Sequence, residues 1–259
     1  MKSYYYLSIA LLTLPACQKV APKPATGPSE LLSKIINNTV GKPGFGKAFL
    51  EFTYKGKQLT TDVEYAYKSD GSVDNTRTTT FNYDGSGNFI STTIVDSNPS
   101  YHAFTGATIT ALNNNISEIK LYQPGNVLYD DVKLFYQGSL LSVTTSPLSN
   151  TFNYNYNSDG NNTQGYGQGV VNTTFDTANT LSSTLPFWVY LVYVRLSDGY
   201  QNGVPLYPGN HNIAKFTDGA LNGLYSYMYD SQHYPTSSTE TFVGNTTTVS
   251  YQYQYIPNN

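Results

Sequence analysis

The residue with the most specific chemical signature is Cys17, the only cysteine in the chain. It directly follows a small residue at the end of the apolar stretch Leu7–Leu14, which is preceded by a positive start at Lys2. This order is typical of an export signal, and the stretch is too short to span a bilayer. A cysteine at this boundary is typical of bacterial lipoproteins, in which it receives acyl chains such as palmitate. We predict removal of residues 1–16 and lipid attachment at Cys17; the alternative is an ordinary secretory signal with a chance cysteine.

Residues 17–28 are expected to tether the lipid to a folded domain at 29–259. Their prolines favour an extended chain at roughly 3 Å per residue, which would hold the domain about 30 Å from the membrane. Gln18 stands where an aspartate usually marks retention in the inner membrane. The sequence therefore favours a lipid anchor in the outer membrane of a bacterial cell envelope and leaves open the periplasmic or surface face.

The glycine-rich segment Gly41–Lys47 spells the front of a phosphate-binding loop. However, Ala48 stands where Ser or Thr would bind Mg²⁺. The residues that follow, 48–54, alternate as in a strand, whereas phosphate binding in such loops needs a helix N-terminus. We expect a turn that leads into a strand. A second segment, Gly165–Gly169, lacks the dinucleotide-binding spacing, so residues 161–169 are expected to form a loop.

Other residue types that support catalysis or metal binding do not form a recognisable pattern. The histidines share no metal-ligand spacing with one another or with the cysteine; they are His102, His211 and His233. Glu118, Asp130 and Asp131 are candidate acids, but neighbouring Asp130 and Asp131 would point to opposite faces of a strand and could not act as a facing pair. We predict no metal, no cofactor and no catalytic residues, so the protein is not expected to be an enzyme.

Tyrosine is the one residue type whose arrangement suggests a ligand, because the chain has 25 tyrosines and several short runs place them at alternate positions. On a curved sheet they could line a groove, with rings that stack on a sugar or an apolar molecule and hydroxyls that orient it. The candidate binding residues are Tyr225, Tyr227, Tyr229, Tyr251, Tyr253 and Trp188. The favoured alternative is that the rings form cross-strand pairs worth some tenths of a kcal/mol each and build the core.

The elements that would position these residues are mostly strands. From Phe45 onward, side chains alternate with a period of two, and Asp-Gly or Asn-Gly turns separate the runs. Both patterns predict an all-β domain built as a long antiparallel meander. The exceptions are 29–36, where Ser29 and an apolar stripe favour a short helix, and 181–196, where a helical plug and a buried strand both fit.

The strands carry an internal repeat. Tyr65–Gly71 and Tyr154–Gly160 share the pattern Tyr-x-Tyr-x-Ser-Asp-Gly, and Tyr227–Tyr234 is a less regular copy. Repeated units of this kind bury their faces by stacking on their neighbours. Each unit is expected to be a strand that ends in a turn.

Composition narrows the functional classes. Charged residues make up 12% of the chain, about half the usual share. A weakly acidic chain without basic clusters argues against nucleic acid as a partner. The predicted partners are the membrane, through the lipid, and a glycan, a lipid-like ligand or another envelope protein.

These repeats and the C-terminal third resemble the tyrosine-rich, YD-repeat-like lipoproteins of Bacteroidota, a domain family of unknown function described as having a porin-like fold. The resemblance rests on Tyr225–Asp230, the turn that leads to Tyr234-Pro235, and the final strand Val249–Tyr255. Gln232-His233 departs from the family's Asp-Gly in that turn. The resemblance implies a strongly curved open sheet or half-barrel, with a helical segment inside it, and no catalytic residues.

Taken together, these patterns favour a non-enzymatic envelope lipoprotein that serves as a repeat-built β scaffold or interaction domain. The first alternative is a binding protein that holds a glycan or an apolar ligand on its concave, tyrosine-lined face. An envelope hydrolase is the least favoured alternative.

Overall fold

The computed structural model of the protein describes residues 28–101, 104–112, 115–137, 140–147, 151–161, 163, 171–185, 209–218, 221–243 and 248–258. The predicted signal at 1–16, Cys17, Trp188 and most of the predicted plug at 181–196 lie outside this part. The two predicted domain boundaries, at 16 and 28, are therefore not tested by the structure.

The described residues form a single 15-stranded sheet in which every pair of neighbouring strands is antiparallel. The strands are β1 (Glu30–Asn37), β2 (Lys47–Lys55), β3 (Gln58–Tyr67), β4 (Val73–Tyr83), β5 (Phe89–Asp96), β6 (Gly106–Leu112), β7 (Asn115–Gln123), β8 (Val127–Gln137), β9 (Leu140–Thr145), β10 (Phe152–Asn153), β11 (Val171–Phe175), β12 (Ile213–Asp218), β13 (Leu221–Tyr229), β14 (Pro235–Val243) and β15 (Thr248–Pro257). Two 3₁₀ turns complete the described part, η1 (Pro99–Tyr101) and η2 (Leu181–Thr184).

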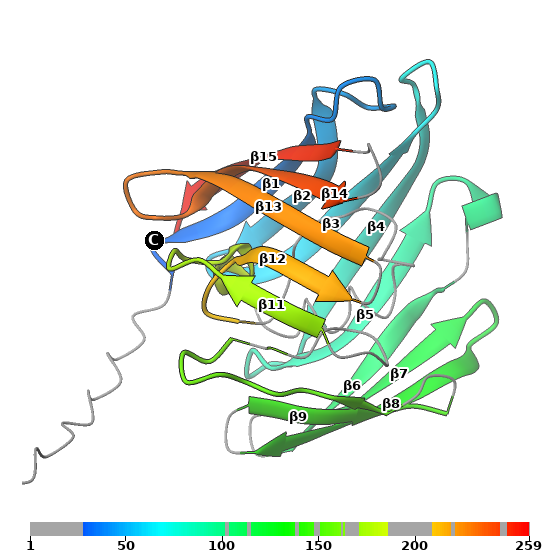
Figure 1. The fold of residues 1–259 in the computed structure, drawn as a ribbon. Coiled ribbons are helices and arrows are strands. Elements are labelled where there is room, and N and C mark those ends of the chain that lie inside the picture. Colours follow the sequence, from blue (N-terminus) through cyan, green and yellow to red (C-terminus); the bar gives the residue numbers. More distant parts are fainter. Residues whose placement is uncertain are drawn as a thin grey trace, which may run out of the picture.

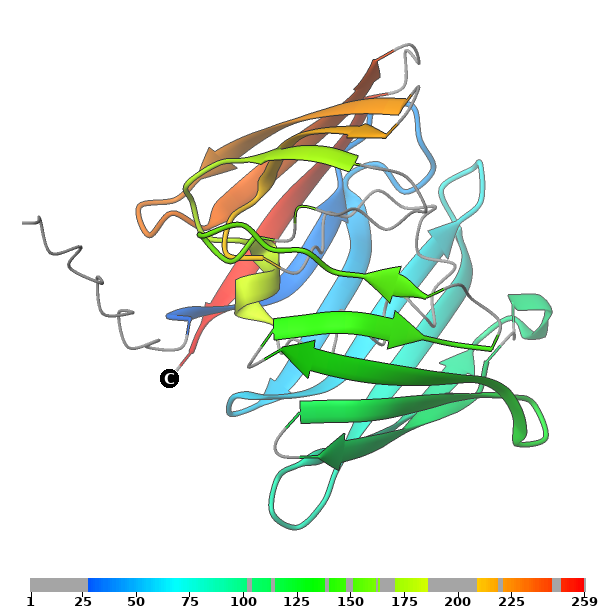
Figure 2. The same cartoon turned by 60° about the horizontal axis from the view of Figure 1, so that its bottom comes forward.

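The sheet is an open meander with β1 near its middle. β1 pairs with both β2 and the last strand, β15, and the free edges belong to β10 and β11. Figures 1 and 2 show that the sheet curls so strongly that its two ends approach each other. At one point they are linked, because the Asn161 side-chain oxygen accepts hydrogen bonds from the backbone N–H groups of Asn210 (2.9 Å) and His211 (2.8 Å). The predicted all-β class and strongly curved open sheet are confirmed.

Apolar residues occupy alternate positions along the strands, so their side chains lie on the inner face of the curved sheet. On β2, Leu50 and Phe52 are buried and Thr53 is exposed. Leu181 of η2 and Leu185 after it join the same core, and Figure 2 shows η2 inside the curve. Neither 3₁₀ turn of the described part has the length or apolar character needed to cross a bilayer.

The predicted helix at 29–36 is wrong, because residues 30–37 form strand β1. Leu32 and Ile35 are both fully buried although they are three residues apart, a spacing that resembles a helix stripe. The cause is a β-bulge between Leu32 and Lys34, which inserts one extra residue against β15 and moves the buried positions out of strict alternation.

Candidate functional site

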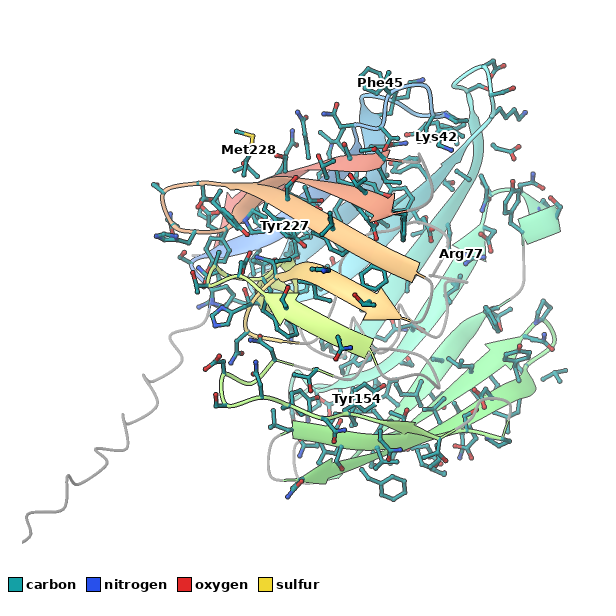
Figure 3. All side chains as sticks on the ribbon, viewed as in Figure 1. Lys42, Phe45, Arg77, Tyr154, Tyr227 and Met228 are labelled. Atoms are coloured by element: carbon teal, nitrogen blue, oxygen red, sulfur yellow. The ribbon has the colours of Figure 1, made fainter. Side chains whose placement is uncertain are left out.

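The five predicted tyrosines lie together on the inner face of β13 and β15, with β14 between these strands. Tyr225, Tyr251 and Tyr253 are buried, and Tyr227 and Tyr229 are partly buried. Figure 3 shows Tyr227 together with Met228, the next residue, which lies 69% exposed on the other face. The alternation therefore places the tyrosines as the sequence predicted, whereas Trp188 lies outside the described residues.

The hydroxyls of four of these tyrosines have partners within the protein. Tyr225 donates to Oε1 of Glu240 at 2.5 Å, and Tyr227 donates to the backbone oxygen of Ile213 at 3.1 Å. Tyr229 donates to the Asp176 carboxylate, and Tyr253 shares a hydrogen bond with the hydroxyl of Ser238.

The tyrosine rings also contact one another. The Tyr225 and Tyr227 rings stack with centroids 6.3 Å apart, and the Tyr227 and Tyr229 rings lie 5.9 Å apart. Offset pairs of this kind stabilise a sheet through cross-ring contact. Ring faces and hydroxyls are thus both engaged inside the domain.

Burial keeps these phenols neutral. It raises the pKa of Tyr229, Tyr251 and Tyr253 well above the usual 10.0, since a phenolate would lose its water. The hydroxyls are therefore hydrogen-bond donors at neutral pH and not nucleophiles.

The wider tyrosine pattern has a structural explanation that the sequence did not suggest. In five cases a tyrosine hydroxyl donates to a backbone oxygen on the strand that precedes its own strand in the chain. Each of these strands contains a β-bulge, and the accepting oxygen belongs to the residue directly before the extra residue of that bulge. We call these contacts the bulge locks. They join Tyr54 to Leu32, Tyr67 to Ala48, Tyr83 to Leu59, Tyr227 to Ile213 and Tyr255 to Pro235, over 2.6–3.1 Å.

The predicted internal repeat corresponds to a recurring turn. In four turns, the first residue's N–H donates to the fifth residue's oxygen and the fourth residue's N–H donates back to the first. The fourth residue has a positive φ each time and is glycine in three of the turns. The turns begin at Lys68, Asp84, Asn157 and Asp230. In the last one His233 takes the glycine's place with φ 64°, so the departure from Asp-Gly leaves the turn geometry intact.

Glu240 is a candidate site residue that the sequence reasoning missed. It projects from β14 onto the tyrosine face, opposite Tyr225, and is only 3% exposed. Its Oε1 accepts the Tyr225 hydrogen bond, whereas no group among the described residues hydrogen-bonds to its Oε2. Burial raises the pKa of Glu240, although the Tyr225 hydroxyl acts in the opposite direction. The sequence offered no local signal for it, because its contact with Tyr225 depends on the register of β14 against β13.

A second polar cluster occupies the inner face of β3–β5. Nε of Arg77 lies 3.0 Å from Oδ1 of Asp96, whose side chain is fully buried, and the Asn75 amide donates to the same oxygen at 2.7 Å. Asp62 is buried on the neighbouring strand. The sequence reasoning missed this cluster because alternating polar residues resemble a solvent-facing row.

The predicted acids do not form a facing pair. Asp130 is buried and accepts hydrogen bonds from the Asp131 N–H (2.9 Å) and from the Ser146 hydroxyl. Asp131 and Glu118 instead pair with Lys133. No group of three potential metal ligands occurs among the described residues.

The phosphate-loop-like segment is a turn that leads into β2, as predicted. Lys47 donates to the backbone oxygen of Gly71 at 2.6 Å and lies 5.6 Å from the centre of the Tyr67 ring. The exposed ammonium group of Lys47 thus contacts the turn after β3 and the Tyr67 ring.

No protein-family model matches the chain, and no curated protein matches it. Among solved structures, the chain is similar to a porin-like protein from Bacteroides uniformis, with a TM-score of 0.30 and 16% sequence identity over 80% of this chain and 76% of that one. A likeness this weak assigns neither a family nor an activity. The resemblance to YD-repeat-like lipoproteins therefore stays a prediction.

Proposed function

We propose that the protein is a lipid-anchored, non-catalytic scaffold or interaction domain of the bacterial cell envelope, most consistent with the outer membrane. The observation that carries the scaffold assignment is the engagement of the tyrosine hydroxyls by internal partners. A face built to orient a ligand keeps polar groups free for it. Here the four hydroxyls hold neighbouring strands and side chains together, so the tyrosine face serves the fold.

The membrane assignment is supported by the sequence around Cys17, which combines a short apolar stretch with a cysteine at the cleavage boundary. Several acyl chains on one cysteine would hold the domain firmly on a bilayer. Cys17→Ala should therefore release the full-length protein from the membrane fraction of the producing cell and abolish its labelling with radioactive palmitate. Ser3→Ala, a change near the signal's start, is the matched control. A Cys17→Ala protein that still sediments with membranes would contradict the anchor.

A second candidate function, binding of a glycan on the concave face, is favoured by one observation. Beside Tyr225, Glu240 offers a buried oxygen that has no hydrogen-bond partner in the described part of the chain, and a sugar hydroxyl could donate to it. The test is a glycan array probed with the wild-type chain and Glu240→Gln, with Ser226→Ala on the opposite face as control. Binding that Glu240→Gln alone abolishes would replace the scaffold assignment, and no binding at millimolar glycan would end this alternative.

A further inference from the structure

The last residue of the repeated turn has different partners in two of its copies. In the turn that begins at Asp84, Asn88 is exposed, and its side-chain amide donates to the Asp84 carboxylate at 2.9 Å. In another copy the equivalent residue is Asn161, which is only 1% exposed. Its side-chain oxygen accepts hydrogen bonds from the backbone N–H groups of Asn210 and His211, at the other end of the sheet. The same turn therefore closes on itself in one place and joins the two ends of the sheet in the other.

A short arm of the chain carries Asn161 to this contact. We call residues 152–161 the strap, and Figures 1 and 2 show it between β9 and β11. Its strand, β10, is only two residues long and pairs with β9. Beyond β10, the Tyr154 N–H donates to the backbone oxygen of Ser142 at 2.8 Å, and residues 157–159 are exposed. A segment with so short a ladder and so much exposed backbone belongs to the low-stability end of a fold.

The segment that receives the strap is fixed more firmly. Asn212 is 5% exposed; its backbone N–H donates to the Asp176 carboxylate at 3.1 Å, and its backbone oxygen accepts from the Asp176 N–H at 3.0 Å. The Asn212 side-chain amide donates to the backbone oxygen of Asn179 at 2.8 Å. These bonds fasten residues 209–212 to the chain that follows β11. If the contact between the two ends breaks, we therefore expect the strap to move and residues 209–212 to stay.

The contact between the strap and residues 209–212 is polar, and most of it lies at the surface. The exposed Asn210 side chain donates to the backbone oxygen of Asp159 at 2.6 Å. Gly160 approaches so closely that a Cβ on it would lie 2.6 Å from the Asn210 amide nitrogen. Water can replace hydrogen bonds of this kind at a small net cost, so the contact can break while the core stays intact.

Tyrosine rings lie where the strap meets β8. Tyr154 is partly buried and packs against the core. Burial raises the pKa of Tyr136, on β8, and of Tyr156, on the strap, to about 12, and the nearby Tyr154 contributes to both shifts. Release of the strap should return these phenols to water.

We infer that the strap is a reversible closure of the curved sheet. When the Asn161 contacts break, the strap leaves residues 209–212, and the sheet opens between β10 and β11 so that solvent or a partner molecule reaches the inner face there. The inference goes beyond the proposed function and does not depend on the lipid anchor. It is compatible with a scaffold and with a binding domain.

Hydrogen exchange of individual amides, followed by NMR on the full-length chain in detergent, tests this closure. Asn161→Ala should accelerate exchange of the Tyr154 amide roughly tenfold, because strap release also breaks its bond to Ser142, which the substitution itself does not touch. The Asn212 amide should exchange as in wild type, since its segment stays in place. The matched control is Asn88→Ala, which changes the equivalent residue of the related turn and should leave both amides unaffected.

The phenol of Tyr136 supplies a second readout, because its pKa should fall toward the usual 10.0 when the strap is released. If Asn161→Ala fails to fold, Asn210→Ala, on the exposed side of the contact, should accelerate Tyr154 exchange by a smaller factor. Unchanged Tyr154 exchange in the folded variants would overturn the inference, because the strap would then stay in place without its contact. Equal acceleration at Tyr154 and Asn212 would overturn it as well, because the strap would then not release as a separate unit.

Discussion

The inner face carries buried carboxylates in both halves of the sheet, and two of them, Asp96 and Glu240, are held differently. Asp96, on β5, lies beside Arg77 and Asn75, and its side chain is fully buried. Glu240, on β14, is also buried, but within the described part of the chain Tyr225 is its only hydrogen-bond donor. An ion pair therefore neutralises the buried charge of Asp96, whereas phenols surround Glu240.

The difference matters because burial penalises an ion that lacks a partner. A buried ion pair lowers the stability of the fold unless its geometry is excellent, because both charges lose their water. Removing one member of the pair leaves the other charge buried and uncompensated. A lone acid responds by holding its proton, which is the direction in which the pKa of Glu240 is moved. The region around Asp96 should therefore be sensitive to loss of a charge partner, and the region around Glu240 should be sensitive to pH.

The largest effect is expected at the ion pair. Arg77→Met should lower the free energy of unfolding by about 3–5 kcal/mol, because Asp96 would stay buried without a cation. Urea unfolding followed by circular dichroism measures this. Adding Asp96→Asn to the same chain should recover a large part of the loss. A loss under about 1 kcal/mol for Arg77→Met would show that the pair contributes little.

The bulge locks should come next. Tyr83→Phe leaves the backbone oxygen of Leu59, a fully buried residue, without its donor, so it should cost about 1–2 kcal/mol in urea unfolding. Tyr129→Phe, on an exposed side chain, is the control and should change stability by less than about 0.5 kcal/mol. Equal effects of the two substitutions would contradict a role for the locks.

Glu240 should make stability depend on pH. Its pKa in the folded protein lies above the usual 4.5, so the folded state binds the proton more tightly than the unfolded chain does. The contribution of Glu240 to the free energy of unfolding is complete at pH values below its pKa in the unfolded chain. This contribution is lost as the pH rises through its pKa in the folded protein. The stability of Glu240→Gln relative to wild type should therefore rise between pH 4 and pH 8, because only the wild-type chain loses this contribution. Parallel pH profiles for the two proteins would contradict the burial of this acid.

The smallest effect is expected in the turn at 230–234. His233 has a positive φ where the three equivalent turns have glycine, and a side chain there is strained. His233→Gly should therefore raise stability by about 0.5–1 kcal/mol, measured as a higher melting temperature. The reverse change, Gly87→His in the equivalent turn, should lower it. A destabilised His233→Gly protein would mean that the imidazole makes a contact that outweighs the strain.

Much of the sheet could be predicted from the sequence, because strands that pair regularly show period-two alternation and are separated by glycine-containing turns. The prediction failed at β1, where a bulge gave Leu32 and Ile35 a helix-like spacing. Bulges depend on the partner strand, so alternation within one strand does not reveal them. The repeated turn could be recognised in the sequence from the Ser-Asp-Gly pattern. The sequence did not show that the same turn also forms with His233 at the glycine position.

The candidate site was predicted only in part. The tyrosines share one face because alternation alone decides this, whereas their partners depend on strand register. Glu240 meets Tyr225 because β14 pairs with β13 in one register, and Arg77 meets Asp96 across β4 and β5 for the same reason. Neither pairing leaves a local sequence signal. Within its own strand, each of these charged residues resembles a solvent-facing residue, and only the curved sheet buries it.

The central claim, that the tyrosine face is internal structure, is tested most directly by the ionisation of its phenols. Carbon-13 NMR of the tyrosine Cζ atoms, assigned by single Tyr→Phe substitutions, follows each phenol with pH. Tyr229, Tyr251 and Tyr253 should show no titration up to the pH at which the protein unfolds, because burial raises their pKa. Reversible titration of these residues near the usual 10.0 in the folded protein would place their hydroxyls in water and contradict the account.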